Sequence, residues 1–167
     1  MLLKTVLEAN EINRNTYNSL ERRAGLQFMK EGLVANAKRG DRYTITHAVA
    51  LGAMLSFQRL GIDAREASGV IDAVYEWLID VVPPLAMDEA IPSIAPARPD
   101  IDPDRTWITI SRFERDGGLG WATGREGADT FSPDPPLVKM SVNVGGLVRK
   151  LNPRIRAAVN AEELQDA

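Results

Sequence analysis

The chain lacks cysteine altogether and has a single histidine. Without cysteine there is no disulfide, no thiolate metal site and no thiol redox switch. Because His47 stands alone, it forms no histidine-based metal site, and we expect it to cap a helix or to lie at the surface. No apolar run approaches the roughly 18–20 residues of a membrane span, and residues 1–4 do not begin a secretory signal. These absences predict a cytoplasmic protein without a membrane partner.

Pairings of residues that would indicate catalysis are also missing. No acid/base pair, nucleophile with a neighbouring base or metal-ligand cluster is visible, so we expect no enzyme activity, no metal and no cofactor. The alternating carboxylates of Asp100, Asp102 and Asp104 lack the glycine and the distant glutamate of a calcium-binding loop. Gly145-Gly146 follows a candidate strand and precedes a candidate helix, a position that could hold an anion.

The overall charge of −3 hides an uneven distribution along the chain. Residues 14–42 contain seven basic and three acidic residues, a local charge of +4, while the rest of the chain carries −7. Because local patches decide contact with nucleic acid, this segment is compatible with a phosphate backbone. A solvated face of a small domain is the alternative.

Apolar spacing and capping residues predict four helices in the first half of the chain. Leu3, Val6 and Leu7 indicate a helix of two turns. A second helix extends over residues 13–24, with Asn13 as N-cap and Gly25 after its end. We expect its inward residues to be Thr16, Tyr17, Leu20 and Ala24.

Between the second and third helices, residues 26–43 predict two short strands around a turn near residues 37–41. A third helix, capped by Thr44 or Thr46, ends at Gly61. The fourth starts near Asp63 and is expected to end at Pro83-Pro84.

The second half of the chain is different in composition. Residues 83–104 hold six prolines and predict a linker, which separates a domain of residues 1–82 from a small α+β module of residues 105–167. Alternating strands are expected at 107–113, 119–123 and 137–144. A helical region follows, restarted at Asn152-Pro153. Its seam, formed by Leu147, Leu151, Ile155 and Val159, is expected to pack on the sheet or on a second subunit.

Several motifs in the first half occur in a familiar order: Ile12-Asn13, Thr16, Glu21-Arg22-Arg23, Gly25-Leu26, Arg42-Tyr43-Thr44, Ala48, Leu51 and Arg59-Leu60-Gly61-Ile62. Residues 2–80 thereby resemble the winged helix-turn-helix domain of the MerR-type family and its excisionase-like relatives. Two departures stand out: Asn18-Ser19-Leu20-Glu21 replaces the usual Arg-Tyr-Tyr-Glu, and a proline-rich segment replaces the long dimerising helix. The resemblance implies an α+β protein with an N-terminal winged helix-turn-helix.

The resemblance also implies a set of DNA-binding residues. In that interpretation Arg14, Asn15 and Asn18 meet base edges, because Arg pairs with guanine and Asn with adenine in the major groove. The basic side chains Arg22, Arg23, Lys38, Arg39 and Arg42 neutralise phosphates. Asn13, Thr16, Ser19 and Tyr43 complete the expected interface. A solvent-exposed polar helix is the alternative.

The sequence therefore leads to one main expectation and one alternative. The main one is a homodimeric transcriptional regulator that binds double-stranded DNA, with residues 13–24 in the major groove and a basic wing of residues 36–42 on the backbone. The module of residues 105–167 would dimerise or sense a small-molecule or protein effector. The alternative is a protein-protein interaction module on the same scaffold, without DNA binding.

Overall fold

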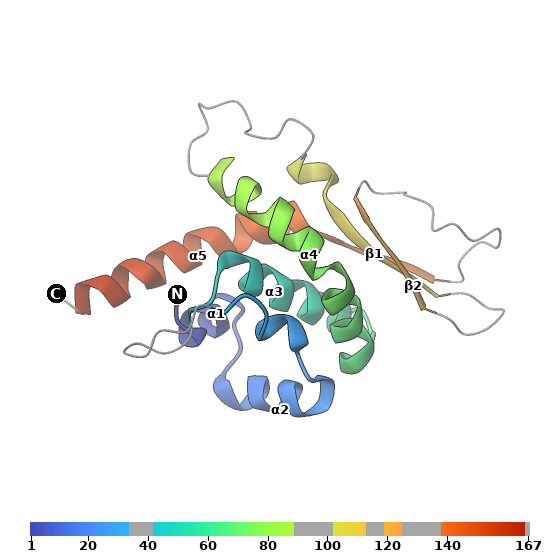
Figure 1. Ribbon diagram of the computed structural model, residues 1–167, viewed down its shortest axis with the longest axis horizontal. Helices are drawn as coiled ribbons and strands as arrows, with labels where there is room; N and C mark the ends of the chain where they lie inside the picture. The colour runs from blue at the N-terminus through green and yellow to red at the C-terminus, as the bar shows by residue number, and fades with distance from the viewer. Residues whose placement is uncertain (34–41, 89–101, 113–118, 125–137, 166–167) are drawn as a thin grey trace.

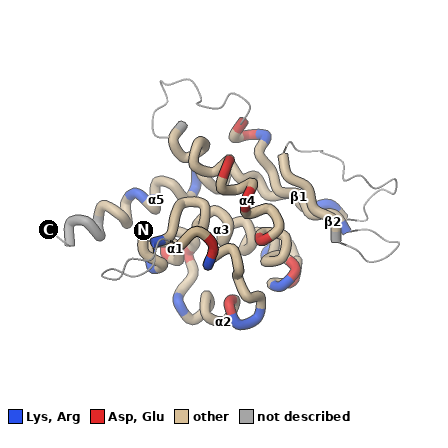
Figure 2. The backbone as a smooth tube through the Cα atoms, viewed as in Figure 1, with Lys and Arg blue, Asp and Glu red and all other residues tan. Residues whose placement is uncertain are grey.

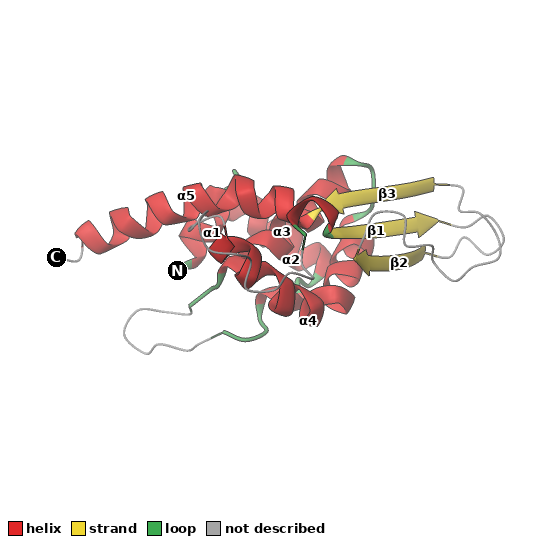
Figure 3. Ribbon diagram, turned by 90° about the horizontal axis from the view of Figure 1, so that it is seen from above, coloured by secondary structure: helices red, strands yellow, loops and turns green. Residues whose placement is uncertain are grey.

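The computed structural model describes residues 1–33, 42–88, 102–112, 119–124 and 138–165. Within these ranges the chain is an α+β protein with five α-helices and a three-stranded antiparallel sheet (Figure 1). The α+β class predicted from the sequence is confirmed. The sheet extends from one end of the helical part of the molecule (Figure 3).

The first two helices follow the sequence closely. Helix α1 spans Leu3–Ala9 and helix α2 spans Arg14–Ala24. Asn13 caps α2 by accepting a hydrogen bond from the Thr16 N–H at 2.9 Å. Gly25 ends α2 with φ of 85°, a left-handed conformation that glycine adopts without a steric penalty. Both predicted helices are therefore confirmed.

The prediction of a strand that starts at Leu26, directly after α2, is wrong for its first residues. Leu26 is fully buried with φ of 42°, and Gln27–Met29 form a short 3₁₀-helix, η1. The Phe28 N–H donates to Asp72 Oδ1 at 2.7 Å, which ties η1 to α4 instead of to a neighbouring strand. The expected turn and most of the wing, residues 34–41, lie outside the described residues.

Helices α3, Ile45–Arg59, and α4, Ala64–Asp88, pack against each other in the core. The predicted end of α4 at Pro83-Pro84 is wrong, because the helix continues to Asp88. The two prolines leave the carbonyls of Ile79 and Asp80 without helical donors, but both residues are exposed, so water can reach them. Burial of Val82 and Leu85 favours continuing the helix.

The sheet contains β1, Trp107–Arg112, β2, Leu119–Gly124, and β3, Val138–Asn143, in the order β2-β1-β3. The three strands lie close to their predicted positions. In the central strand, Ile110 is paired with Trp121 on one side and Met140 on the other. Ile108 and Ile110 are buried and belong to the hydrophobic core. A second 3₁₀-helix, η2, at Pro103–Arg105 precedes β1 and begins in the segment predicted to be linker.

The last helix, α5, spans Val144–Gln165 without the expected restart at Pro153. Pro153 lies on the exposed side together with Arg149, one turn earlier, so water can reach the backbone where proline interrupts the helical hydrogen bonds. The expected packing of the α5 seam on the sheet or on a second subunit is wrong. Leu151 and Ile155 are buried, and α5 packs on α1, α3 and α4.

Hydrophobic residues from both halves of the chain consequently share one core. The division into domains at residues 82 and 105 stays a prediction, but the described part of the second half does not build a separate core of its own.

Candidate nucleic-acid interface

The turn between α1 and α2 has a well-defined backbone structure. The Glu11 N–H donates to the Glu8 carbonyl at 3.0 Å, and the Ile12 N–H donates to the Leu7 carbonyl at 3.1 Å. These two bonds form a Schellman motif, in which Glu11 takes the left-handed position with φ of 59°. Asn10 Nδ2 donates to the carbonyls of Val6 and Ala48, both at 3.0 Å, so the turn is also fixed to α3. We call α1, the turn and α2 the helix-turn-helix unit, in the geometric sense of two helices joined by a tight turn. The winged helix-turn-helix domain stays a prediction.

Helix α2 places one face in the core and leaves the other open. Tyr17 and Leu20 are buried, and burial raises the pKa of Tyr17 to about 12, so its hydroxyl stays protonated at neutral pH. Ala24 is half-buried against the core. Thr16, expected to point inward, is exposed instead, because its hydroxyl bonds to Asn13 Oδ1 at 3.1 Å at the start of the helix.

The residues predicted to bind DNA divide into three groups. Six are exposed on α2 or at its start: Asn13, Arg14, Asn15, Thr16, Arg22 and Arg23. Four are half-buried: Asn18, Ser19, Arg42 and Tyr43. Lys38 and Arg39 lie outside the described residues. Most of the predicted α2 residues are therefore exposed. Basic residues lie at both ends of this helix (Figure 2).

Two residues of this set already have structural roles. Asn13 Oδ1 accepts bonds from both the backbone and the hydroxyl of Thr16, so it serves as the helix cap. Tyr43 exchanges backbone hydrogen bonds with Met1: its N–H donates to the Met1 carbonyl at 2.9 Å, and the N-terminal ammonium donates to the Tyr43 carbonyl at 3.1 Å. These contacts favour a structural contribution of Asn13 and Tyr43.

The arginines on α2 are held by their own helix. Arg22 Nε donates to the Asn18 carbonyl at 3.2 Å, and Arg23 Nε donates to the Ser19 carbonyl at 3.4 Å. These bonds leave the terminal guanidinium nitrogens available for an anion. Arg14 lies 5.6 Å from the centre of the Tyr17 ring. Within the described part of the chain, none of the three forms an ion pair, whereas the neighbouring Glu21 pairs with Lys30 at 3.8 Å.

His47 fixes the segment that follows η1. The Thr44 N–H donates to His47 Nδ1 at 3.0 Å, so Nε2 carries the ring proton and donates to the Glu31 carbonyl at 2.8 Å. The predicted capping role is confirmed, but the alternative surface position is wrong, since His47 is only 1% exposed. Burial lowers the pKa of His47 below its usual 6.5, and the ring is neutral.

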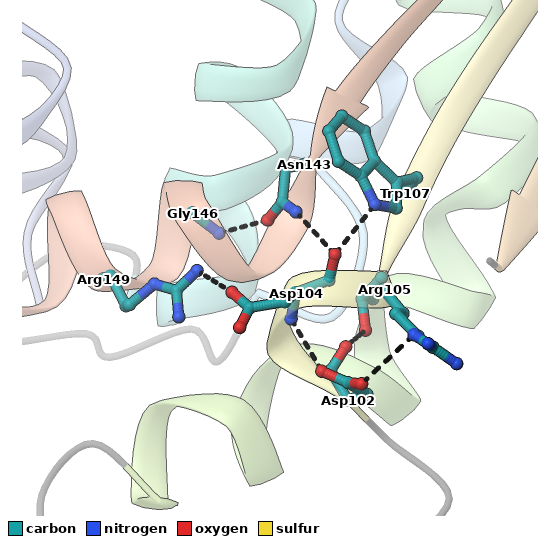
Figure 4. Close-up of polar contacts among 8 residues, drawn as sticks. Asp102, Asp104, Arg105, Trp107, Asn143, Gly146 and Arg149 are labelled. Carbon is teal, nitrogen blue, oxygen red and sulfur yellow. Dashed lines mark hydrogen bonds and ion pairs between the residues drawn. The ribbon is translucent and has the colours of Figure 1, made fainter. Parts of the chain in front are cut away.

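The position at the start of α5 that could hold an anion is filled by the chain itself (Figure 4). A Cβ at Gly145 would overlap the Pro103 carbonyl oxygen, and the Gly146 N–H already donates to Asn143 Oδ1. The nearby Asp104 also has partners within the chain. Its carbonyl accepts from Trp107 Nε1 at 3.1 Å, and its carboxylate pairs with Arg149.

The carboxylates of Asp102 and Asp104 also have partners within the chain, whereas Asp100 lies outside the described residues. Asp102 accepts the Asp104 N–H at 2.9 Å and lies 3.7 Å from Arg105 Nε. Over the described ranges, no group of three His, Asp or Glu side chains is placed to hold a metal ion.

One contact with the helix-turn-helix unit could not be found from the sequence. Arg154 of α5 pairs with Glu11 at 2.9 Å and donates to the Ala9 carbonyl at 3.2 Å. A cavity of about 20 Å³ lies beside this turn, with Asn10, Ser56, Arg59 and Lys150 among its lining residues. A cavity of this size holds roughly one water molecule and is too small for an effector.

Comparisons of this chain with protein families, with curated proteins and with solved structures found no match. No helix in the described residues is both long and apolar enough to cross a membrane.

Proposed function

We propose that this chain is a sequence-specific DNA-binding transcriptional regulator. The observation that carries the proposal is the exposed face of α2, which follows a helix-turn-helix turn and presents Arg14, Arg22 and Arg23 without ion-pair partners among the described residues. Uncompensated guanidinium groups at both ends of one exposed helix suit the phosphates and base edges of a major groove. With 11 residues, α2 is about 16 Å long, which is sufficient to contact several base pairs.

Each part of α2 takes a different role in this proposal. Arg14 and Asn15 at its exposed start read base edges, as recognition helices generally do with their N-terminal residues. Arg22 and Arg23 bind phosphates, since their Nε atoms are already bonded to the helix and orient the remaining guanidinium nitrogens. Lys38, Arg39 and Arg42 would contact the flanking backbone as a basic wing.

A homodimer belongs to the same proposal, because one short helix reads few base pairs and symmetry doubles the site. The α5 seam does not supply the interface, since it packs within the chain. The edge strands are more suitable: Trp121 on β2 and Val138 on β3 are both exposed.

The same exposed residues favour the second candidate, a protein-protein interaction module. Large apolar side chains on two sheet edges are typical of surfaces that bind another chain. In this case α2 would be a solvated polar helix, and the helix-turn-helix unit would serve as a scaffold.

A selection from random DNA with the purified full chain, carried out at two salt concentrations, tests the two candidates. We expect enrichment of a defined site and a steep decrease in affinity with salt, because phosphate binding releases counterions. Failure of a folded chain to enrich any DNA at the lower salt would reject the proposal and leave the interaction module.

A further inference from the structure

The C-terminal helix reaches back to the helix-turn-helix unit through one side chain. Arg154 Nη1 donates to the Ala9 carbonyl at 3.2 Å and lies 2.9 Å from Glu11 Oε1. Ala9 is the last residue of α1, and Glu11 is the left-handed residue of the turn that leads to α2. Arg154 therefore contacts both sides of the point where the chain changes direction.

The Arg154 contact completes the hydrogen bonding at the end of α1. The last four carbonyls of a helix have no donor within the helix. Here the carbonyls of Val6, Leu7 and Glu8 accept from backbone N–H groups of the turn. The fourth carbonyl, that of Ala9, accepts from Arg154. A positive charge at this end also interacts favourably with the helix dipole.

The backbone conformation of Glu11 also makes the turn energetically costly. A left-handed backbone is costly for any residue with a Cβ, and glycine is the usual choice at this position. The carboxylate of Glu11 is held by Arg154, which keeps the residue in place. The backbone of Arg154 is itself well anchored, since Leu151 and Ile155 are buried and Asn152 Nδ2 donates to the Ala86 carbonyl at 3.0 Å.

We infer that Arg154 is a positioning residue for DNA recognition: it holds the α1–α2 turn and so sets the direction of α2, without contacting DNA. The inference rests on the proposed DNA-binding function. It assigns to α5, far away in the sequence, a direct part in orienting the recognition helix.

Hydrogen exchange of the DNA-free protein tests whether Arg154 holds the α1–α2 turn. Arg154→Ala should accelerate exchange of the Glu11 and Ile12 amides by roughly threefold to tenfold, because these amides form the turn and open more often without the contact. The matched control is Arg156→Ala, which removes the same charge from an exposed position two residues along α5. Equal exchange in the two variants would overturn the inference, whether or not the protein binds DNA.

A second pair of variants tests whether the Glu11–Arg154 contact affects DNA binding, because the two explanations predict opposite changes in affinity. Glu11→Gln removes a negative charge, so electrostatics alone predicts tighter DNA binding. If Glu11 acts through Arg154, affinity for the selected site should instead decrease by about twofold to tenfold, while the salt dependence is unchanged. Glu8→Gln, at an exposed acid three residues earlier on α1, is the control and should not weaken binding.

The outcomes separate the inference from the proposed function. Tighter binding by Glu11→Gln would overturn the inference. A lower salt slope in Arg154→Ala with an unchanged turn would also overturn it and would make Arg154 a phosphate contact. A wild-type chain that selects no DNA would reject the proposed function, and with it the effect of the contact on DNA binding, while the exchange result still decides whether Arg154 holds the turn.

Discussion

At the scale of single residues, His47 shows how a buried polar side chain can be fixed in one protonation state. Its Nδ1 faces a backbone N–H, and its Nε2 faces a carbonyl oxygen. A second proton on Nδ1 would face the Thr44 N–H, and burial already disfavours the charged ring. His47 also packs edge-on against Tyr43, with ring centres 5.3 Å apart. Protonation would therefore oppose the folded state.

The first prediction follows from this lowered pKa. The folded pKa of His47 lies below its unfolded value, so the unfolded chain binds the proton more strongly. The stabilisation is complete above pH 6.5 and is lost as the pH falls through the folded pKa, at up to about 1.4 kcal/mol per pH unit. Denaturant unfolding between pH 7.5 and 5 measures this loss. His47→Gln, which cannot titrate, should remove this contribution, and an unchanged pH profile in the variant would contradict the assignment.

The second prediction concerns two glycines whose replacement by alanine should change the stability of the chain in opposite directions. Gly145 faces the Pro103 carbonyl so closely that a Cβ has no room, whereas a Cβ at Gly69 in α4 would have no neighbouring atom within 4 Å. Gly145→Ala should destabilise the chain by about 2 kcal/mol or more, because backbone must move to relieve the clash. Gly69→Ala should stabilise it by roughly 0.5–1 kcal/mol, since alanine is the better helix former. Thermal unfolding of both variants checks this, and a stable Gly145→Ala variant would show that η2 does not press on the start of α5.

At the scale of secondary structure, α2 has a buried face and an exposed face, and basic residues lie near both of its ends. Its inner face is anchored by Tyr17 and Leu20, and its outer face carries exposed polar groups such as Asn15. Arg22 and Arg23 near the other end are pre-oriented by bonds to the helix backbone. Such a division would let one end contribute specificity and the other contribute affinity.

The third prediction compares the two ends of α2. Arg22→Ala combined with Arg23→Ala should weaken binding to all DNA sequences and lower the log–log salt slope by roughly 0.9 for each lost phosphate contact. Arg14→Ala or Asn15→Ala should instead reduce discrimination at one position of the selected site by about 1–3 kcal/mol. Binding titrations on selected and random DNA measure both effects. A uniform loss in all variants would place phosphate contacts along the whole helix.

At the scale of the whole molecule, α5 completes the core formed by α1, α3 and α4. Leu147 and Leu151 lie against Gly52 of α3, where a Cβ would approach Leu151 Cδ1 to 3.3 Å and Asn10 Oδ1 to 2.9 Å. The absence of a side chain at Gly52 therefore allows α3, the turn and α5 to approach one another closely. The helix-turn-helix unit is stabilised by a helix from the other end of the chain.

The fourth prediction tests this dependence. Leu151→Ala should destabilise the whole chain by about 2–5 kcal/mol, because it leaves a cavity in the shared core. Leu60→Ala, at an exposed position, should change the stability by less than about 0.5 kcal/mol. Truncation after residue 143 should prevent cooperative unfolding altogether. A fragment that still melts cooperatively at the temperature of the full chain would show that the first half folds independently.

The sequence by itself determined the local features of this protein. Asn13 and Gly25 mark the ends of α2 because capping and left-handed turns depend on neighbouring residues only. For α3 the sequence left Thr44 and Thr46 open, and the structure places the cap at Thr44. Alternation of apolar residues identified the three strands, and together with the expected helices they agree with the α+β class that the family resemblance implied. The exposed arginines of the candidate interface were also recognisable from their spacing on α2.

Only the tertiary structure decided the features that depend on distant contacts. Helix α4 continues past Pro83-Pro84 because burial of Leu85 outweighs the lost hydrogen bonds, a balance that local preference does not contain. The α5 seam packs on the first half of the chain because the core has an open side there. Arg154 meets Ala9 across 145 positions of sequence, and no local pattern encodes a contact made only when the helices pack together.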